Sequence, residues 1–114
     1  MAVSVVDVSE LAPGGLQAVK VGERKVLVCR VGDEYFAIEN FCPHATVSLA
    51  RGRLVGSELE CPFHGGKLDV KSGNPVAPPI RRPVATFQVR SVDGGIEVDT
   101  SVCADAESRG LRDA

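Results

Sequence analysis

Two short stretches, Cys42-Pro43-His44 and Cys61-Pro62-Phe63-His64-Gly65-Gly66, place both histidines of the chain just behind a cysteine–proline pair. Each stretch offers one sulfur and one nitrogen, and sixteen residues separate His44 from Cys61. Thiolate and imidazole are the side-chain ligands that proteins use for zinc, copper and iron. The pattern therefore predicts one metal centre held jointly by two loops, with Cys42, His44, Cys61 and His64 as its ligands.

One soft and one harder ligand in each loop suit a two-metal centre whose ends differ chemically. Thiolates stabilise ferric iron by donation and by their negative charge, and neutral imidazoles do so less. One iron would then take both cysteines, and the other both histidines. Two other interpretations stay open at this point: a single zinc ion bound by the same side chains, and a disulfide between Cys42 and Cys61, which would leave the histidines unexplained.

The spacing resembles the Rieske family of [2Fe–2S] proteins, whose pattern is CxH in one loop and CPxHG in the other. The likeness extends from Asn40 to Pro79 and includes residues beyond the ligands, namely Leu49, Gly52, Gly65, Asp69, Gly73 and Pro78-Pro79. The resemblance implies one [2Fe–2S] cluster per chain, bound by Cys42, His44, Cys61 and His64. It also implies an all-β fold: a Rieske-like antiparallel β-sandwich with two cluster-binding loops at one tip.

Two departures from the Rieske proteins of cytochrome bc complexes concern the reduction potential. Those proteins carry an additional cysteine in each loop, joined as a disulfide, and a hydroxyl two residues after the second histidine; here Phe63 and Gly66 stand at the corresponding places. Fewer hydrogen-bond donors stabilise the reduced cluster less. We therefore expect a potential at the low end of the Rieske range of roughly −150 to +300 mV, which a redox titration would test.

The resemblance also limits the function. Ring-hydroxylating oxygenases add a mononuclear iron bound by two histidines and a carboxylate, and no histidine is left for such a site. The chain is instead similar to the soluble Rieske ferredoxins of bacterial aromatic-ring dioxygenase systems. This implies an electron carrier rather than an enzyme, with a flavin-dependent ferredoxin reductase as donor and a terminal Rieske oxygenase as acceptor. The alternatives are a small Rieske subunit of a nitrite reductase-like complex and, in a different class, a zinc-binding structural module.

Composition is that of a single soluble domain of 12.0 kDa, with 44% hydrophobic and 25% charged residues. A net charge of −2 gives no support for nucleic-acid binding. The N-terminal residues lack the features of a signal peptide, and no apolar run is long enough to cross a membrane. We therefore expect a cytoplasmic monomer without membrane contact.

Short segments rich in Val, Ile and Leu, separated by glycines and prolines, predict antiparallel strands joined by hairpins. The prolines between Asn74 and Pro79 predict a surface connector there, not a strand. We expect the Rieske domain to span residues 1–100, followed by a flexible tail at 101–114. The predicted strands are Ala2–Val8, Leu16–Val21, Lys25–Val31, Tyr35–Glu39, Glu58–Glu60, Lys67–Val70, Val84–Arg90 and Ile96–Asp99.

Overall fold

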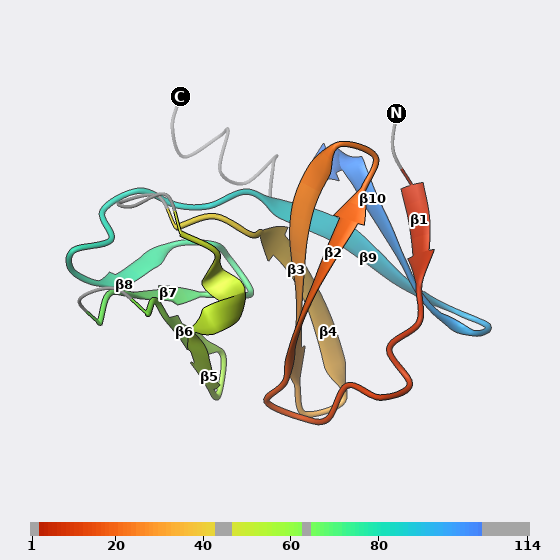
Figure 1. Cartoon of the computed structure of the whole chain (residues 1–114), viewed down its shortest axis with the longest axis horizontal. Coiled ribbons are helices and arrows are strands. Elements are labelled where there is room, and N and C mark those ends of the chain that lie inside the picture. The colour runs from red at the N-terminus through yellow and green to blue at the C-terminus, as the bar shows by residue number, and fades with distance from the viewer. Residues whose placement is uncertain (1–2, 43–46, 63–64, 104–114) are drawn as a thin grey trace.

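The computed structural model describes residues 3–42, 47–62 and 65–103, and within them it is built almost wholly of two antiparallel sheets (Figure 1). The six-stranded sheet has the order β1-β10-β9-β4-β3-β2, and the four-stranded sheet has the order β5-β6-β7-β8. The prediction of an all-β antiparallel fold is confirmed. The strands are β1 Val3–Val6, β2 Leu16–Val21, β3 Arg24–Val31, β4 Glu34–Glu39, β5 Arg53–Val55, β6 Glu58–Glu60, β7 Lys67–Asp69, β8 Pro75–Ala77, β9 Thr86–Val92 and β10 Gly95–Cys103.

Two-residue turns join the hairpins β2–β3, β3–β4 and β9–β10 of the large sheet. Each turn contains a predicted glycine in the left-handed region, with φ of +62° at Gly22, +60° at Gly32 and +89° at Gly94. Such backbone conformations match the twist of paired strands and cost glycine little. The predicted joining of strands by hairpins is therefore confirmed for these three pairs.

The small sheet is an insertion into the large one. The chain leaves the large sheet after β4 and returns at β9, which pairs with β4 through Ala37↔Phe87 and Ile38↔Thr86. Residues 40–85, here called the insert, lie between these two points and contain both candidate metal loops. In Figure 1 the insert forms the left half of the molecule and the large sheet the right half.

Strand β3 separates two hydrophobic cores. Leu27 and Cys29 belong to a core shared with the insert, which also contains Leu59, Leu68 and the two cysteines of the metal loops. Val26 and Val28, on the alternate positions of β3, belong to a second core inside the large sheet. Because successive side chains of a strand point to opposite faces, β3 is buried on both sides and reads as a nearly continuous apolar run.

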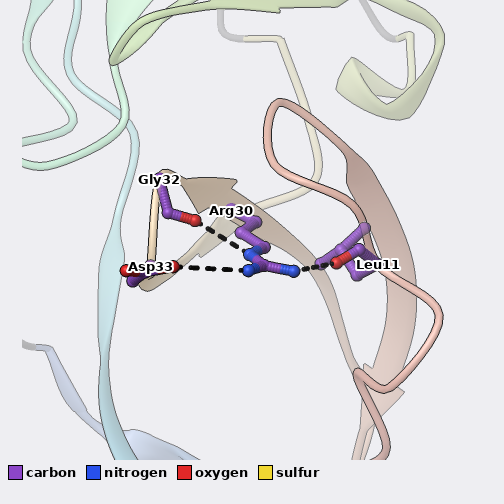
Figure 2. A network of polar contacts seen from close by, with 4 residues as sticks. All are labelled: Leu11, Arg30, Gly32 and Asp33. Atoms are coloured by element: carbon purple, nitrogen blue, oxygen red, sulfur yellow. Dashed lines mark hydrogen bonds and ion pairs between the residues drawn. The ribbon is translucent and has the colours of Figure 1, made fainter.

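Arg30, near the end of β3, fixes the long connection between β1 and β2 to the β3–β4 turn (Figure 2). Its guanidinium donates to the carbonyl oxygens of Leu11 (2.7 Å) and Gly32 (2.8 Å) and lies 3.5 Å from the Asp33 carboxylate. The guanidinium carbon also lies 5.6 Å from the centre of the Tyr35 ring. One side chain thus holds three segments together at the end of the large sheet.

The prediction of a connector at Asn74–Pro79 was wrong, because Pro75–Ala77 forms strand β8. This strand lies at the edge of its sheet and pairs only with β7, so the missing N–H of Pro75 costs no ladder hydrogen bond on the open side. Strand β5 and a short 3-10 helix at Leu49–Arg51 were also not predicted.

The other predicted strand boundaries coincide with the observed ones or differ by one or two residues, except that β10 continues to Cys103, beyond the predicted end at Asp99. Residues 104–114 lie outside the described part of the chain, so the division into a domain at 1–100 and a tail at 101–114 stays a prediction. No helix among the described residues is long and apolar enough to cross a membrane.

Candidate metal centre

The two candidate loops close in the same way. The amide of Cys42 donates to the carbonyl oxygen of Val47 at 3.0 Å, and the amide of Cys61 donates to the carbonyl oxygen of Gly66 at 2.6 Å. In both loops a cysteine is therefore tied to the residue five positions later. His44 and His64 fall within these two closed segments in the sequence and lie outside the described residues.

The structure brings the two cysteine sulfurs together. The Sγ atoms of Cys42 and Cys61 are 3.1 Å apart, and the two residues are 0% and 1% exposed. A disulfide bond would require about 2.05 Å, so the sulfurs are adjacent without being bonded. A metal–thiolate bond is about 2.3 Å long, and a single ion can therefore reach both sulfurs at this separation.

Buried, unbonded and adjacent sulfurs are what two thiolate ligands of one metal ion require. The donor set thus fits the sulfur end of the predicted two-metal centre.

Asn40 holds the first loop in place. Its side-chain Oδ1 accepts hydrogen bonds from the Ser48 hydroxyl at 3.0 Å and from the Ala50 amide at 3.1 Å, and only 8% of the residue is exposed. The Ser48 hydroxyl also accepts from the Ala50 amide and so caps the 3-10 helix. A single buried amide therefore connects the start of the loop to the segment that follows it, which limits the positions open to Cys42.

Two glycines support the second loop because neighbouring atoms lie closer to their backbone than a side chain would normally permit. A Cβ on Gly52 would lie 2.1 Å from the carbonyl oxygen of Glu60, the residue before Cys61. A Cβ on Gly66 would lie 2.8 Å from a side-chain carbon of Ile80. Gly52, just before β5, therefore lies directly against the backbone of Glu60 next to Cys61, and the segment after β8 lies directly against Gly66.

These contacts explain two features that the sequence only suggested. The Gly66 contact explains why this chain has no hydroxyl-bearing residue two positions after its second histidine, since Ile80 fills the space. Gly52 supports the loop geometry from outside the ligand motif.

Asp69 and Gly73 organise the turn between β7 and β8. The Asp69 carboxylate accepts from the Lys71 amide at 2.9 Å and from the Ser72 hydroxyl at 3.4 Å. Gly73, with φ of +79°, donates its amide to the Asp69 carbonyl and accepts from the Val84 amide at 2.9 Å. This turn thus anchors the chain where it returns to the large sheet, at the end of β7 opposite the second loop.

Cys29 is a core residue and lies on β3. Burial raises the pKa of its thiol to about 12, so it remains protonated at physiological pH. Thiolates, not thiols, bind metals. We therefore do not expect Cys29 to bind a metal.

Comparison with known proteins identifies the family. Residues 1–88 match the model of the Rieske [2Fe-2S] domain family. The chain belongs to this family. Its cofactor is accordingly a [2Fe–2S] cluster, and the zinc-module and disulfide interpretations are set aside.

Several of the similar proteins are ferredoxins. Ferredoxin CarAc of Metapseudomonas resinovorans is 40% identical over 91 residues, which cover 79% of this chain and 85% of the relative. The ferredoxin of carbazole 1,9a-dioxygenase from Nocardioides aromaticivorans IC177 superposes with a TM-score of 0.80 at 38% identity, over 86% of this chain and 96% of that one. A ferredoxin bound to its oxygenase in the carbazole 1,9a-dioxygenase complex gives a TM-score of 0.77 at 39% identity, over 82% and 88% of the two chains.

Sequence reasoning found Gly52 only through the resemblance, and it missed the roles of Asn40 and Ser48, which support the first loop without being metal ligands. Asn40 and Ser48 carry the polar side chains that commonly cap turns, and this was the available signal. The closeness of Gly52 to Glu60 has no such signal, because it depends on how β5 and β6 pair.

Proposed function

We propose that this protein is the ferredoxin component of an aromatic-ring dioxygenase system and carries single electrons to a terminal Rieske oxygenase. The observation that carries the proposal is the pair of buried sulfurs of Cys42 and Cys61, which lie 3.1 Å apart without a disulfide bond at the junction of two Rieske loops. The related ferredoxin seen in complex with its oxygenase supports the choice of acceptor.

We further propose that Cys42 and Cys61 bind one iron and that His44 and His64 bind the other. The identical closure of the two loops supports this assignment, because each closed segment contains one cysteine and one histidine in its sequence. The chain has no other histidine. When bound, a [2Fe–2S] cluster supplies a reversible one-electron couple, and ligation by two neutral imidazoles raises its potential above that of an all-cysteine cluster.

The chain's own residues prepare the site for this role. Asn40, Gly52 and Gly66 hold the backbone next to Cys42 and Cys61 in place, and such rigid support lowers the reorganisation that a change of charge would cause. Leu49, Leu59 and Leu68 are fully buried in the core that contains both cysteines, and they keep water from the sulfur side. A buried apolar core on the cysteine side of the cluster and loops on its other side suit a carrier that exchanges electrons through its surface.

The donor in this scheme is a flavin-dependent ferredoxin reductase, and the protein acts as a cytoplasmic monomer. These assignments follow the resemblance to dioxygenase ferredoxins and go beyond the acceptor named above. Size-exclusion chromatography of the holoprotein tests the monomer. Reduction by NADH together with a purified reductase tests the donor.

The central experiment mixes the reduced holoprotein, without oxygen, with a terminal oxygenase purified from the same cells. We expect the visible absorption of the oxidised ferredoxin to return as electrons leave, and product to form only when the ferredoxin is present. Failure to reduce any terminal oxygenase, together with stable co-purification with a nitrite reductase-like enzyme, would contradict the proposal and favour the alternative subunit role.

A further inference from the structure

The cluster-binding part of this acidic protein is basic. The insert, residues 40–85, contains six Lys and Arg against three Asp and Glu, whereas the rest of the chain contains seven against twelve. The insert therefore has a net charge of +3 and the remainder −5, which together give the overall −2. Such a separation of charge orients the molecule in the field of a charged partner.

Two arginines border the second loop. A hollow of about 200 Å³ is lined by Arg51 and Arg53 together with Glu60, Cys61, Pro62 and Gly65. Arg53 is paired with Glu60 at 3.2 Å and is thereby largely neutralised. Arg51 is exposed and makes no ion pair within the described part of the chain. One uncompensated positive charge therefore lies beside Cys61.

A lysine and an exposed aromatic ring border the first loop. Lys25 lines a hollow of about 400 Å³ with Asn40, Phe41, Val47 and Ser48. Phe41 is 44% exposed although the next residue, Cys42, is fully buried. Lys25 lies directly across from Lys20 in the β2–β3 pair, an arrangement of like charges that destabilises a sheet. Both lysines are exposed, and the described residues give neither of them an acidic partner.

A third positive charge, that of Arg81, lies next to the residue that packs against the second loop. Ile80 packs against Gly66, and Arg81, the next residue, is exposed. No ion pair of Arg81 occurs among the residues that the structure describes. Positive charges thus border both loops, and among the described residues the one carboxylate that lines these two hollows, that of Glu60, is already paired with Arg53.

We propose that Lys25, Arg51 and Arg81, with the exposed ring of Phe41, form a docking face for an acidic surface on the terminal oxygenase. The inference rests on the proposed function and adds the chemistry of the partner's surface: carboxylates around an apolar contact. At physiological ionic strength charges farther away than about 8 Å are largely screened, so a partner at the loops senses the local positive charges more than the net charge of −2.

The field at the loops is tested with small electron acceptors of opposite charge. The reduced holoprotein is oxidised by ferricyanide or by a tripositive cobalt(III) complex at ionic strengths from about 0.1 to about 1 M, where the Debye length falls from about 10 to about 3 Å. We expect oxidation by ferricyanide to slow with added salt and oxidation by the cobalt complex to accelerate. The net charge alone predicts the opposite signs, and observing those would overturn the proposal.

Matched charge reversals test docking itself. Arg51→Glu reverses a charge that borders the second loop. Lys71→Glu makes the same change of net charge at the far end of β7, where Lys71 contacts the Phe36 ring. We expect Arg51→Glu to slow electron transfer to the oxygenase about 10-fold at low salt, within the range of electrostatic steering, and Lys71→Glu to leave it unchanged. Arg51→Gln, which removes the charge without reversing it, should give an intermediate rate.

Each outcome separates the two proposals. Equal effects of Arg51→Glu and Lys71→Glu, or no effect of either, would overturn the docking face while leaving the carrier function intact. If the unmodified protein reduces no terminal oxygenase but shows the expected salt dependence with ferricyanide, the proposed function fails, and with it the oxygenase as the occupant of this face. The visible spectrum of each variant reports whether the cluster is retained.

Discussion

Replacing Gly52 by alanine should break the support behind Cys61. The new Cβ would lie 2.1 Å from the carbonyl oxygen of Glu60, whereas real Cβ atoms essentially never come closer than 3.0 Å. The two backbones would have to separate by about 0.9 Å, the difference between these distances. Because the neighbour is backbone, no rotamer change can relieve the clash. Glu60 precedes Cys61 directly, so the shift also moves one of the two sulfurs.

The cost can be estimated from its parts. Overpacking a well-packed site costs roughly 1–3 kcal/mol, and weakening one hydrogen bond of the β5–β6 pair costs about 1 kcal/mol. Together these give roughly 2–4 kcal/mol, a large share of the 5–15 kcal/mol typical of a domain. For a domain of about this size, about 4–8 °C per kcal/mol implies a fall in Tm of roughly 8–32 °C.

Two glycine variants calibrate the measurement. Gly66→Ala meets side-chain atoms of Ile80 and Pro79, which can move, so we expect a smaller loss of stability than for Gly52→Ala. Gly56→Ala, in the β5–β6 turn, meets no atom within 4 Å and carries only the cost of its φ of +61°, about 1–2 kcal/mol.

Thermal unfolding and the iron content per chain of the three purified variants are the assays. Gly52→Ala should show the lowest Tm and the largest loss of iron. A Gly52→Ala protein with the Tm and iron content of the Gly56→Ala protein would refute the close approach and the role assigned to it.

Three further changes test separate parts of the structure. Thr86→Val should raise the free energy of unfolding by about 1 kcal/mol, because the buried Thr86 hydroxyl has no hydrogen-bond partner among the described residues; urea denaturation measures this, and a loss of stability would contradict it. Asn40→Ala should speed the loss of the cluster to a chelator and lower the free energy of unfolding by roughly 1–3 kcal/mol, while Asn40→Asp keeps the acceptor oxygen and should lose less stability. Equal rates of cluster loss in the two variants would argue against the role of the Asn40 hydrogen bonds in holding the first loop. Cys29→Val should flatten the decline of stability above pH 9. The folded thiol, with its pKa raised to about 12, retains a proton that the unfolded thiol releases near its ordinary pKa of 9.0. The free energy of unfolding of the unmodified protein therefore falls by about 1.4 kcal/mol per pH unit between these two values. Urea midpoints at pH 8, 9.5 and 10.5 measure the slope, and identical slopes in both proteins would show that Cys29 does not titrate as described.

The hairpins of the large sheet were predictable because their signals are local. Gly22, Gly32 and Gly94 stand between apolar runs of alternating burial, and each allows the positive φ that a two-residue turn requires. The ligand spacing was equally local, since each cysteine and histidine share one loop. Both predictions needed only residues a few positions apart.

Strand β8 and the supports of the metal loops depend on contacts between distant segments. Proline argues against a strand in general, but Pro75 is tolerated because β8 lies at a sheet edge, and edge position is a property of the complete topology. Likewise, Gly52 is required by the backbone of Glu60, the strand partner of the next residue, Arg53, and Gly66 is required by Ile80. Arg30 joins Leu11 to a turn on another hairpin, which no periodicity in the sequence indicates.

The ligand assignment is tested most directly by electron–nuclear double resonance on the reduced holoprotein, grown with ¹⁵N-labelled histidine. Because the chain has only His44 and His64, every histidine coupling can be assigned to these two residues. Binding of one iron by both imidazoles predicts two strongly coupled ¹⁵N nuclei. A folded, iron-containing protein whose spectrum lacks ¹⁵N coupling would contradict the account.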